Sequence, residues 1–197
     1  VIKVLNNLKD VLNNLESQLA LYDELIKSRF IEMFHDKEFP ENSLSEVCEE
    51  LFAGGDVDKE DLSTVKDSMH PFPIFTNGEK DDGLYGFTSK ARVFKEAVTI
   101  SGRGTIGYSS LRNEPFYPAV RLIVAVPNNE LVTGQYLKQF ISMNNYGGQG
   151  ASIPQLTVPM VKGEIIPVPP LHLQNEFAAF VKQTDKSKFI GYCRYFL

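Results

Sequence analysis

The sequence predicts an α+β protein in which a loop-rich mixed α/β domain is flanked by a long N-terminal coiled-coil-like helix and a shorter C-terminal helix. Two observations support this class. Apolar residues recur at helical spacing through the first 34 residues, and again after a proline-rich segment near residue 169. Between these segments, short β-rich runs alternate with clusters of turn residues.

The first predicted element is a helix over residues 1–35, which contain neither proline nor glycine. A helix of this length spans about 50 Å, so its apolar stripe needs a second helix to cover it. We therefore expect an antiparallel helical hairpin or bundle, with an ordinary surface helix as the alternative. The expected helix-pairing or dimerisation residues are Leu5, Leu8, Leu12, Leu15, Leu19, Tyr22, Leu25, Ile26, Phe177 and Phe180.

The central domain is expected over residues 36–168. It begins with residues 41–52 (ENSLSEVCEELF), where Asn42 or Ser43 is available as a helix cap. The pattern then predicts one helix at residues 133–144 and strands at residues 73–75, 84–87, 97–100, 119–126 and 164–168.

The closing segment follows residues 167–170 (PVPP), which cannot continue a helix or a central strand. Helical spacing resumes from Leu171, and we expect a C-terminal helix over residues 169–189. Residues 190–197 are short and aromatic and are interpreted as an atypical tail.

Charge is distributed unevenly along the chain. The formal net charge is −5, but residues 32–70 alone carry three bases and twelve acids. The rest is neutral to mildly basic, so the overall charge lowers the expectation of nucleic-acid binding without excluding it.

No run of about 18 uncharged apolar residues occurs, and the N-terminal sequence lacks the pattern of a secretory signal. We therefore expect a cytoplasmic protein with no membrane partner. In that reducing compartment, Cys48 and Cys193 are expected to be free thiols.

Residues 102–107 (GRGTIG) match the spacing of a dinucleotide-binding motif, which must be followed by a helix and, about twenty residues later, by an acidic residue. Turn residues and an apolar strand occupy those places. A hairpin tip that uses glycines for positive φ and presents Arg103 and Thr105 fits better.

Other catalytic and metal patterns find no support. The acidic run at residues 54–61 (GGDVDKED) lacks the ligand order of a calcium loop, and the three histidines have no zinc-site context. No nucleophile elbow occurs. We expect no metal and no catalytic residue in this chain.

Several polar loops remain, rich in groups that contact DNA bases and phosphates. The candidate DNA-binding residues are Asn77, Lys80, Lys90, Arg92, Arg103, Thr105, Tyr108, Ser109, Arg112, Asn145, Tyr146, Gln149 and Ser152.

Four segments, in this order, resemble the second half of a type I restriction-modification specificity subunit. They are residues 20–34 (ALYDELIKSRFIEMF), residues 100–107 (ISGRGTIG) with NEPFYP at 113–118, residues 150–156 (GASIPQL), and residues 165–171 (IIPVPPL) through Gln174. The resemblance covers about residues 5–189.

The resemblance implies that residues 36–168 form a target recognition domain, which reads one half of a split double-stranded DNA target. It further implies that the long helices act as a spacer and dock methyltransferase (M) subunits, through which restriction (R) subunits join. S-adenosylmethionine, magnesium and ATP would serve those partners, with no cofactor bound by this chain. With one recognition domain, the chain resembles a half subunit that pairs with a second half or forms a homodimer.

Two alternatives remain. The first is a protein-interaction module that oligomerises through the long helix, with the loop-rich domain binding a protein or glycan. The second is a nucleotide-binding enzyme built on residues 102–107.

Overall fold

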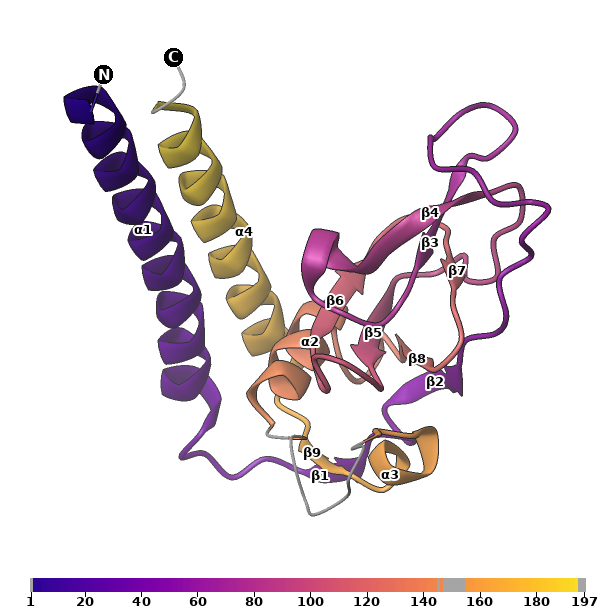
Figure 1. Cartoon of the computed structure of the whole chain (residues 1–197). Helices are drawn as coiled ribbons and strands as arrows, with labels where there is room; N and C mark the ends of the chain where they lie inside the picture. Colours follow the sequence, from indigo (N-terminus) through magenta and orange to yellow (C-terminus); the bar gives the residue numbers. More distant parts are fainter. Residues whose placement is uncertain (1, 145, 147–154, 195–197) are drawn as a thin grey trace. The chain divides into compact units, whose positions relative to one another are not determined.

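The computed structural model describes residues 2–144, 146 and 155–194. The chain divides into two compact units (Figure 1): a helical unit, Val1–Lys37 with His172–Leu197, and a sheet unit, Glu38–Leu171. The α+β class predicted from the sequence is confirmed.

The helical unit consists of α1 (Ile2–Phe34) and α4 (Leu171–Arg194), which lie side by side and antiparallel. Phe177 packs against Phe30 and Phe34, with ring centroids 5.3 and 5.9 Å apart. Farther along α4, Lys188 donates to Asp23 at 3.0 Å. Residues nearer the C-terminus of α4 therefore contact residues nearer the N-terminus of α1, as in an antiparallel helical hairpin.

The expected pairing residues divide into four groups. Leu15, Ile26 and Phe177 are buried, whereas Leu19, Tyr22 and Phe180 are half-buried. Leu25 is 48% exposed, because consecutive helical residues point about 100° apart and Ile26 is the one that is buried. The side chains of Leu5, Leu8 and Leu12 lie outside the described residues.

Helix α4 ends later than expected, at Arg194 rather than residue 189, so residues 190–194 belong to the helix and not to a separate tail. Its one glycine, Gly191, costs a helix interior about 1 kcal/mol relative to alanine, which does not end a helix that has no proline after it. Among the described helices, none is both long and apolar enough to span a membrane.

The sheet unit contains a four-stranded antiparallel sheet and a three-stranded sheet. The first has the order β2 (Cys48–Ala53), β8 (Leu122–Pro127), β5 (Ala97–Ser101), β6 (Ser109–Arg112). The second has the order β4 (Leu84–Thr88), β3 (Phe72–Phe75), β7 (Tyr117–Pro118), and a separate pair joins β1 (Glu41–Ser43) to β9 (Ile165–Pro167). The remaining elements are η1 (Lys80–Gly83), α2 (Gly134–Met143) and α3 (Val158–Lys162).

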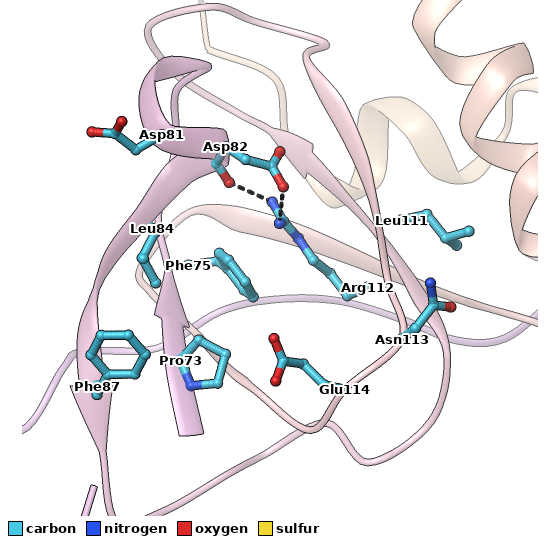
Figure 2. A pocket seen from close by; sticks show the side chains of 10 residues that line it. All are labelled: Pro73, Phe75, Asp81, Asp82, Leu84, Phe87, Leu111, Arg112, Asn113 and Glu114. Atoms are coloured by element: carbon cyan, nitrogen blue, oxygen red, sulfur yellow. Dashed lines mark hydrogen bonds and ion pairs between the residues drawn. The ribbon is translucent and has the colours of Figure 1, made fainter. Parts of the chain in front are cut away.

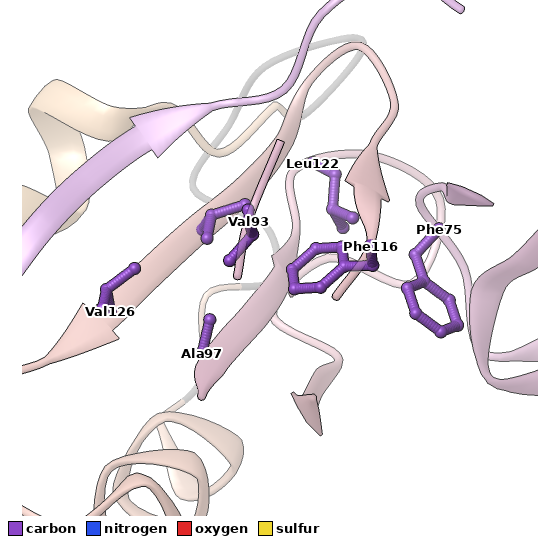
Figure 3. Close-up of a cluster of buried hydrophobic side chains, with 7 residues drawn as sticks. Phe75, Val93, Ala97, Phe116, Leu122 and Val126 are labelled. Carbon is purple, nitrogen blue, oxygen red and sulfur yellow. The ribbon is translucent and has the colours of Figure 1, made fainter. Parts of the chain in front are cut away.

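Strand β8 is buried along its whole length, because both faces of its sheet are covered. Helix α2 packs on β5, β6 and β8. Figure 3 shows the cluster of buried side chains that includes Phe75 and Phe116, whose ring centroids are 5.6 Å apart. This two-sided core fixes the sheet from whose ends the polar loops emerge.

Most predicted strands are present. Strands β3, β4, β5 and β9 and helix α2 occupy the expected places, and Thr133 caps α2 by accepting from the Tyr136 amide at 3.3 Å. The strand expected at residues 119–126 begins only at Leu122, because residues 119–121 form a turn in which the Leu122 amide donates to the Ala119 carbonyl at 3.1 Å.

The helix for which Asn42 or Ser43 was a candidate cap does not form. Ser43 and Glu46 form one half of a capping box, in which the Ser43 amide donates to the Glu46 carboxylate at 2.7 Å. The Ser43 hydroxyl also donates to this carboxylate at 2.8 Å, while the Glu46 amide donates to the Ser43 carbonyl. This arrangement closes a single turn. The chain then enters β2, because Leu44 and Val47 are buried in the sheet unit, where tertiary packing overrides the local signal.

Replacing Phe177 with alanine should lower the free energy of unfolding by about 3–5 kcal/mol, because a fully buried aromatic ring between two helices is lost. Leu21→Ala on α1 is the control, since Leu21 is 67% exposed. Chemical unfolding followed by circular dichroism measures both variants. Equal effects would contradict the observed α1–α4 pairing.

Cys48 is a free thiol whose pKa is raised by burial from 9.0 to about 12. At pH 8 it should therefore hold about a thousandfold less thiolate than an exposed cysteine. In a Cys193→Ser variant, reaction with a disulfide reagent should be slow in the native protein and fast in denaturant. Similar rates in both conditions would show that Cys48 is accessible and ionisable.

Candidate functional site

Three loops of the sheet unit meet at the side chain of Asn77. Its amide nitrogen donates to the Val120 carbonyl at 3.1 Å, and its amide oxygen accepts from the Gly102 N–H at 2.8 Å. The neighbouring Gly78 N–H donates to the Ser101 hydroxyl at 2.9 Å. One side chain therefore joins the loop after β3, the β5–β6 connection and the turn before β8.

Gly102 brings these loops into close contact. A Cβ atom at this position would lie 2.7 Å from the Arg121 carbonyl oxygen and 2.8 Å from that of Leu156. The Leu156 N–H also donates to the Gly102 carbonyl at 2.9 Å, which adds a fourth segment. We call residues 76–80, 101–108, 119–121 and 155–156 the loop edge.

The β5–β6 connection is the hairpin expected from the glycine pattern. Gly104 and Gly107 have φ angles of +69° and +81°, which glycine adopts without strain. The segment after Gly107 leads into strand β6 (Ser109–Arg112). The helix required for a dinucleotide motif is therefore replaced by a strand, and residues 102–107 do not have the context of a nucleotide site.

Three of the candidate DNA-binding residues lie open on the loop edge. Lys80 and Thr105 are exposed, and Arg103 is half-buried. The Nε atom of Arg103 is buried and has no hydrogen-bond acceptor among the described residues. These three side chains come from two different loops, so the fold brings together groups that are separated by more than twenty residues of sequence.

Five other candidates make hydrogen bonds within the fold. Asn77 joins the loops, the Tyr108 phenol donates to Asp82, the Ser109 hydroxyl donates to the Lys138 carbonyl, and the Tyr146 phenol donates to Glu164. Burial raises the pKa of both tyrosines, so each phenol stays protonated near neutral pH.

The fifth, Arg112, is only 6% exposed. Its guanidinium donates to the Thr99 hydroxyl at 3.1 Å, to the Asp82 carbonyl at 2.7 Å and to the Asp82 carboxylate. It also lies over the Phe75 ring, 3.6 Å from the centroid. Figure 2 shows that Asp82 occupies the outer end of this guanidinium.

A pocket of about 560 Å³ lies beside Arg112, between the two sheets. Figure 2 shows its lining residues: Pro73, Phe75, Asp81, Asp82, Leu84, Phe87, Leu111, Arg112, Asn113 and Glu114. Three of these residues are acidic and the single base is paired with Asp82. The charge of this pocket is unfavourable for a phosphate group.

The remaining described candidates, Lys90 and Arg92, have partners elsewhere in the sheet unit. Lys90 lies 3.6 Å from the Asp58 carboxylate, and the Arg92 guanidinium lies 4.5 Å from the centroid of the Phe52 ring. Asn145, Gln149 and Ser152 lie outside the described residues. Within the part of the chain that is described, no three His, Cys, Asp or Glu side chains gather to form a metal site.

One exposed basic residue of the loop edge, Arg121, was not among the candidates. It has a φ angle of +68°, the left-handed conformation that side chains other than glycine rarely adopt. The sequence gives no signal for this feature, because residues 119–126 have the composition of a continuous strand.

Residues 36–190 match the family model of the type I restriction modification DNA specificity domain. The chain belongs to this family. Two Mycoplasma pneumoniae proteins assigned as type I specificity subunits, S.MpnORF507P and S.MpnORF89P, are 29% and 33% identical to it over 178 and 138 residues. These alignments cover 85% and 70% of this chain and 48% and 41% of the relatives. The resemblance drawn from the sequence motifs is confirmed.

Solved structures of specificity subunits share the fold. The S subunit from M. genitalium superposes with a TM-score of 0.65 at 18% identity, over 90% of this chain and 50% of that one. The HsdS subunit from Thermoanaerobacter tengcongensis gives 0.57 at 16% identity, over 95% and 49%. This specificity-domain chain thus spans about half the length of the relatives it matches.

Replacing Asp82 with alanine should lower the free energy of unfolding by about 2 kcal/mol, because the buried Arg112 guanidinium loses its carboxylate partner. Asp81→Ala is the matched control. Asp81 has a similar left-handed φ, 50° against 54°, and no interaction of its carboxylate occurs within the described chain. Chemical unfolding measures both variants, and equal losses would contradict a structural role for the Asp82–Arg112 pair.

Proposed function

We propose that this chain is a DNA-recognition half subunit of a type I restriction-modification system, without catalytic activity of its own. In this proposal the sheet unit is the target recognition domain, and it reads one half of a split double-stranded DNA target. The observation that carries the proposal is the loop edge, where three segments of a specificity-family domain, joined through Asn77 and Gly102, carry Lys80, Arg103, Thr105 and Arg121.

The charge distribution in the sheet unit supports a DNA-binding surface at the loop edge. Outside the loop edge, Lys66, Lys90 and Lys95 form ion pairs with Glu114, Asp58 and Glu49. Arg103 and Arg121 have no acidic partner within the described residues. DNA binding requires cations that can replace the counterions of phosphates, and these two arginines are available for that purpose.

The helical unit supports the proposed partners. Val11, Leu21 and Leu25 of α1 are between 38% and 67% exposed, although α4 covers the neighbouring face. Apolar side chains on a helix already paired once offer a surface to another chain. We propose that these helices dock methyltransferase subunits, and restriction subunits through them, and that a second half or a second copy of this chain completes the subunit.

Chemistry in such a complex would belong to the partners. S-adenosylmethionine would be bound by the methyltransferase subunits, and magnesium and ATP by the restriction subunits, all in the cytoplasm where the DNA lies. The alternative remains a protein-interaction module that oligomerises through α1, which the same exposed apolar residues would also support.

Co-expression with the methyltransferase subunit encoded beside it tests the function directly. We expect methylated adenines at one defined sequence, and a triple variant Lys80→Ala, Arg103→Ala, Arg121→Ala should reduce the methylated fraction at least tenfold at unchanged protein level. The control is the triple variant Lys66→Ala, Lys90→Ala, Lys95→Ala, which removes the same charge from ion-paired sites. Purification of an intact complex that gives no sequence-specific methylation would contradict the proposal and favour the protein-interaction module.

A further inference from the structure

The backbone at Arg121 has a conformation that glycine adopts more easily than arginine. Its φ of +68° is strained for a residue that has a Cβ atom. The conformation is imposed from both sides, since Asn77 binds the Val120 carbonyl and Gly102 packs against the Arg121 carbonyl oxygen. Strain of this kind is concentrated at functional sites, so the arginine side chain needs a reason to be there.

Arg103 provides a second and independent observation. Within the described residues, its buried Nε–H group meets no hydrogen-bond acceptor. Buried donors are almost always satisfied, and an ion or other molecule bound beside the guanidinium is one explanation of such an exception. The acceptor that a guanidinium prefers is an oxyanion, with which it can make two parallel hydrogen bonds.

The backbones of the two arginines are neighbours in space. Gly102, directly before Arg103, is so close to the Arg121 carbonyl that a Cβ atom on it would lie 2.7 Å from that oxygen. In the described part of the chain, the amides of Arg103, Gly104 and Thr105 donate no hydrogen bond to another backbone group. Consecutive backbone amides that are not used within the backbone are typical of an anion-binding loop.

Within the described residues, neither Arg103 nor Arg121 forms an ion pair with an acidic side chain. The Asp82 carboxylate accepts instead from Arg112, Ser110 and the Tyr108 phenol. The pair therefore keeps its positive charge for a ligand outside the fold.

We propose that Arg103 and Arg121 form a phosphate site for the sugar–phosphate backbone of duplex DNA, in which Arg121 is the anchor that the strained turn holds at the loop edge. This inference rests on the proposed function and adds to it a specific role for Arg103 and Arg121. A phosphate contact positions the domain on the duplex, whereas neighbouring side chains of the loop edge read the bases. Free inorganic phosphate offers the same chemistry, so the experiment compares the two sources.

The test uses Arg121→Gly, which removes the charge and the backbone strain together. We expect its melting temperature to rise by about 2–4 °C, because glycine adopts a left-handed φ without strain. We also expect weaker binding to duplexes of every sequence, with the slope of log Kd against log salt concentration smaller by about 1. Arg103→Ala should reduce the slope by the same amount, and the double variant by about 2.

Arg121→Lys and Lys66→Ala are the controls: the first keeps a charge at the loop edge, and the second removes one that is paired with Glu114. Both should retain the wild-type salt dependence. All variants are measured as the full chain in complex with its methyltransferase, and inorganic phosphate at millimolar concentration is titrated in a parallel series.

An Arg121→Gly variant that is as stable as wild type or more so, yet binds DNA with an unchanged salt slope, would overturn the inference and leave the proposed function intact. Weaker binding of inorganic phosphate with unchanged DNA binding would likewise overturn the assignment to DNA. If wild type itself shows no salt-dependent binding to any duplex, the proposed function fails, and the inference fails with it.

Discussion

The sheet unit depends on one junction, in which the amide of Asn77 and the bare Cα of Gly102 hold separate loops together. Asn77 donates to one loop and accepts from another, so neither aspartate nor leucine could replace it. Gly102 allows the Arg121 and Leu156 carbonyl oxygens to approach a backbone that has no side chain in the way. Without this junction the loops would leave the sheet independently, and the basic groups they carry would have no fixed spacing.

Many polar side chains of the sheet unit form hydrogen bonds within the fold and are therefore not available to a ligand. Arg112, Ser109 and Tyr146 resemble DNA-contacting groups by residue type, yet each makes a buried or partly buried hydrogen bond within the fold. A buried polar atom without a partner is costly, and loops that pack as closely as these must satisfy their groups internally. The proposed DNA surface is formed by the side chains that are not used in this way, Lys80, Arg103, Thr105 and Arg121. This surface is smaller than the one that loop composition alone would indicate.

Sequence reasoning succeeded where a single repeating interaction determines structure. The apolar residues at helical spacing predicted α1, the pattern at residues 133–144 predicted α2, and the glycines predicted the hairpin at Gly104. It failed where distant packing decides. Ser43 and Glu46 form one of the two bonds of a capping box, but the burial of Leu44 and Val47 directs the chain into a strand. The left-handed turn at Arg121 is set by Asn77 and Gly102, which lie 44 and 19 positions away in the sequence, so no local pattern reveals it.

Chemical footprinting of arginines tests the central claim, that the loop edge is the surface which meets DNA. The chain in complex with its methyltransferase would be treated with an arginine-specific dicarbonyl, with and without duplex DNA that contains the methylated sequence, and modification would be quantified by mass spectrometry. The account predicts that DNA protects Arg103 and Arg121, while Arg92, which lies over Phe52, keeps its reactivity. Protection of Arg92 with unchanged modification of Arg103 and Arg121 would contradict it and place the DNA on a different face of the sheet unit.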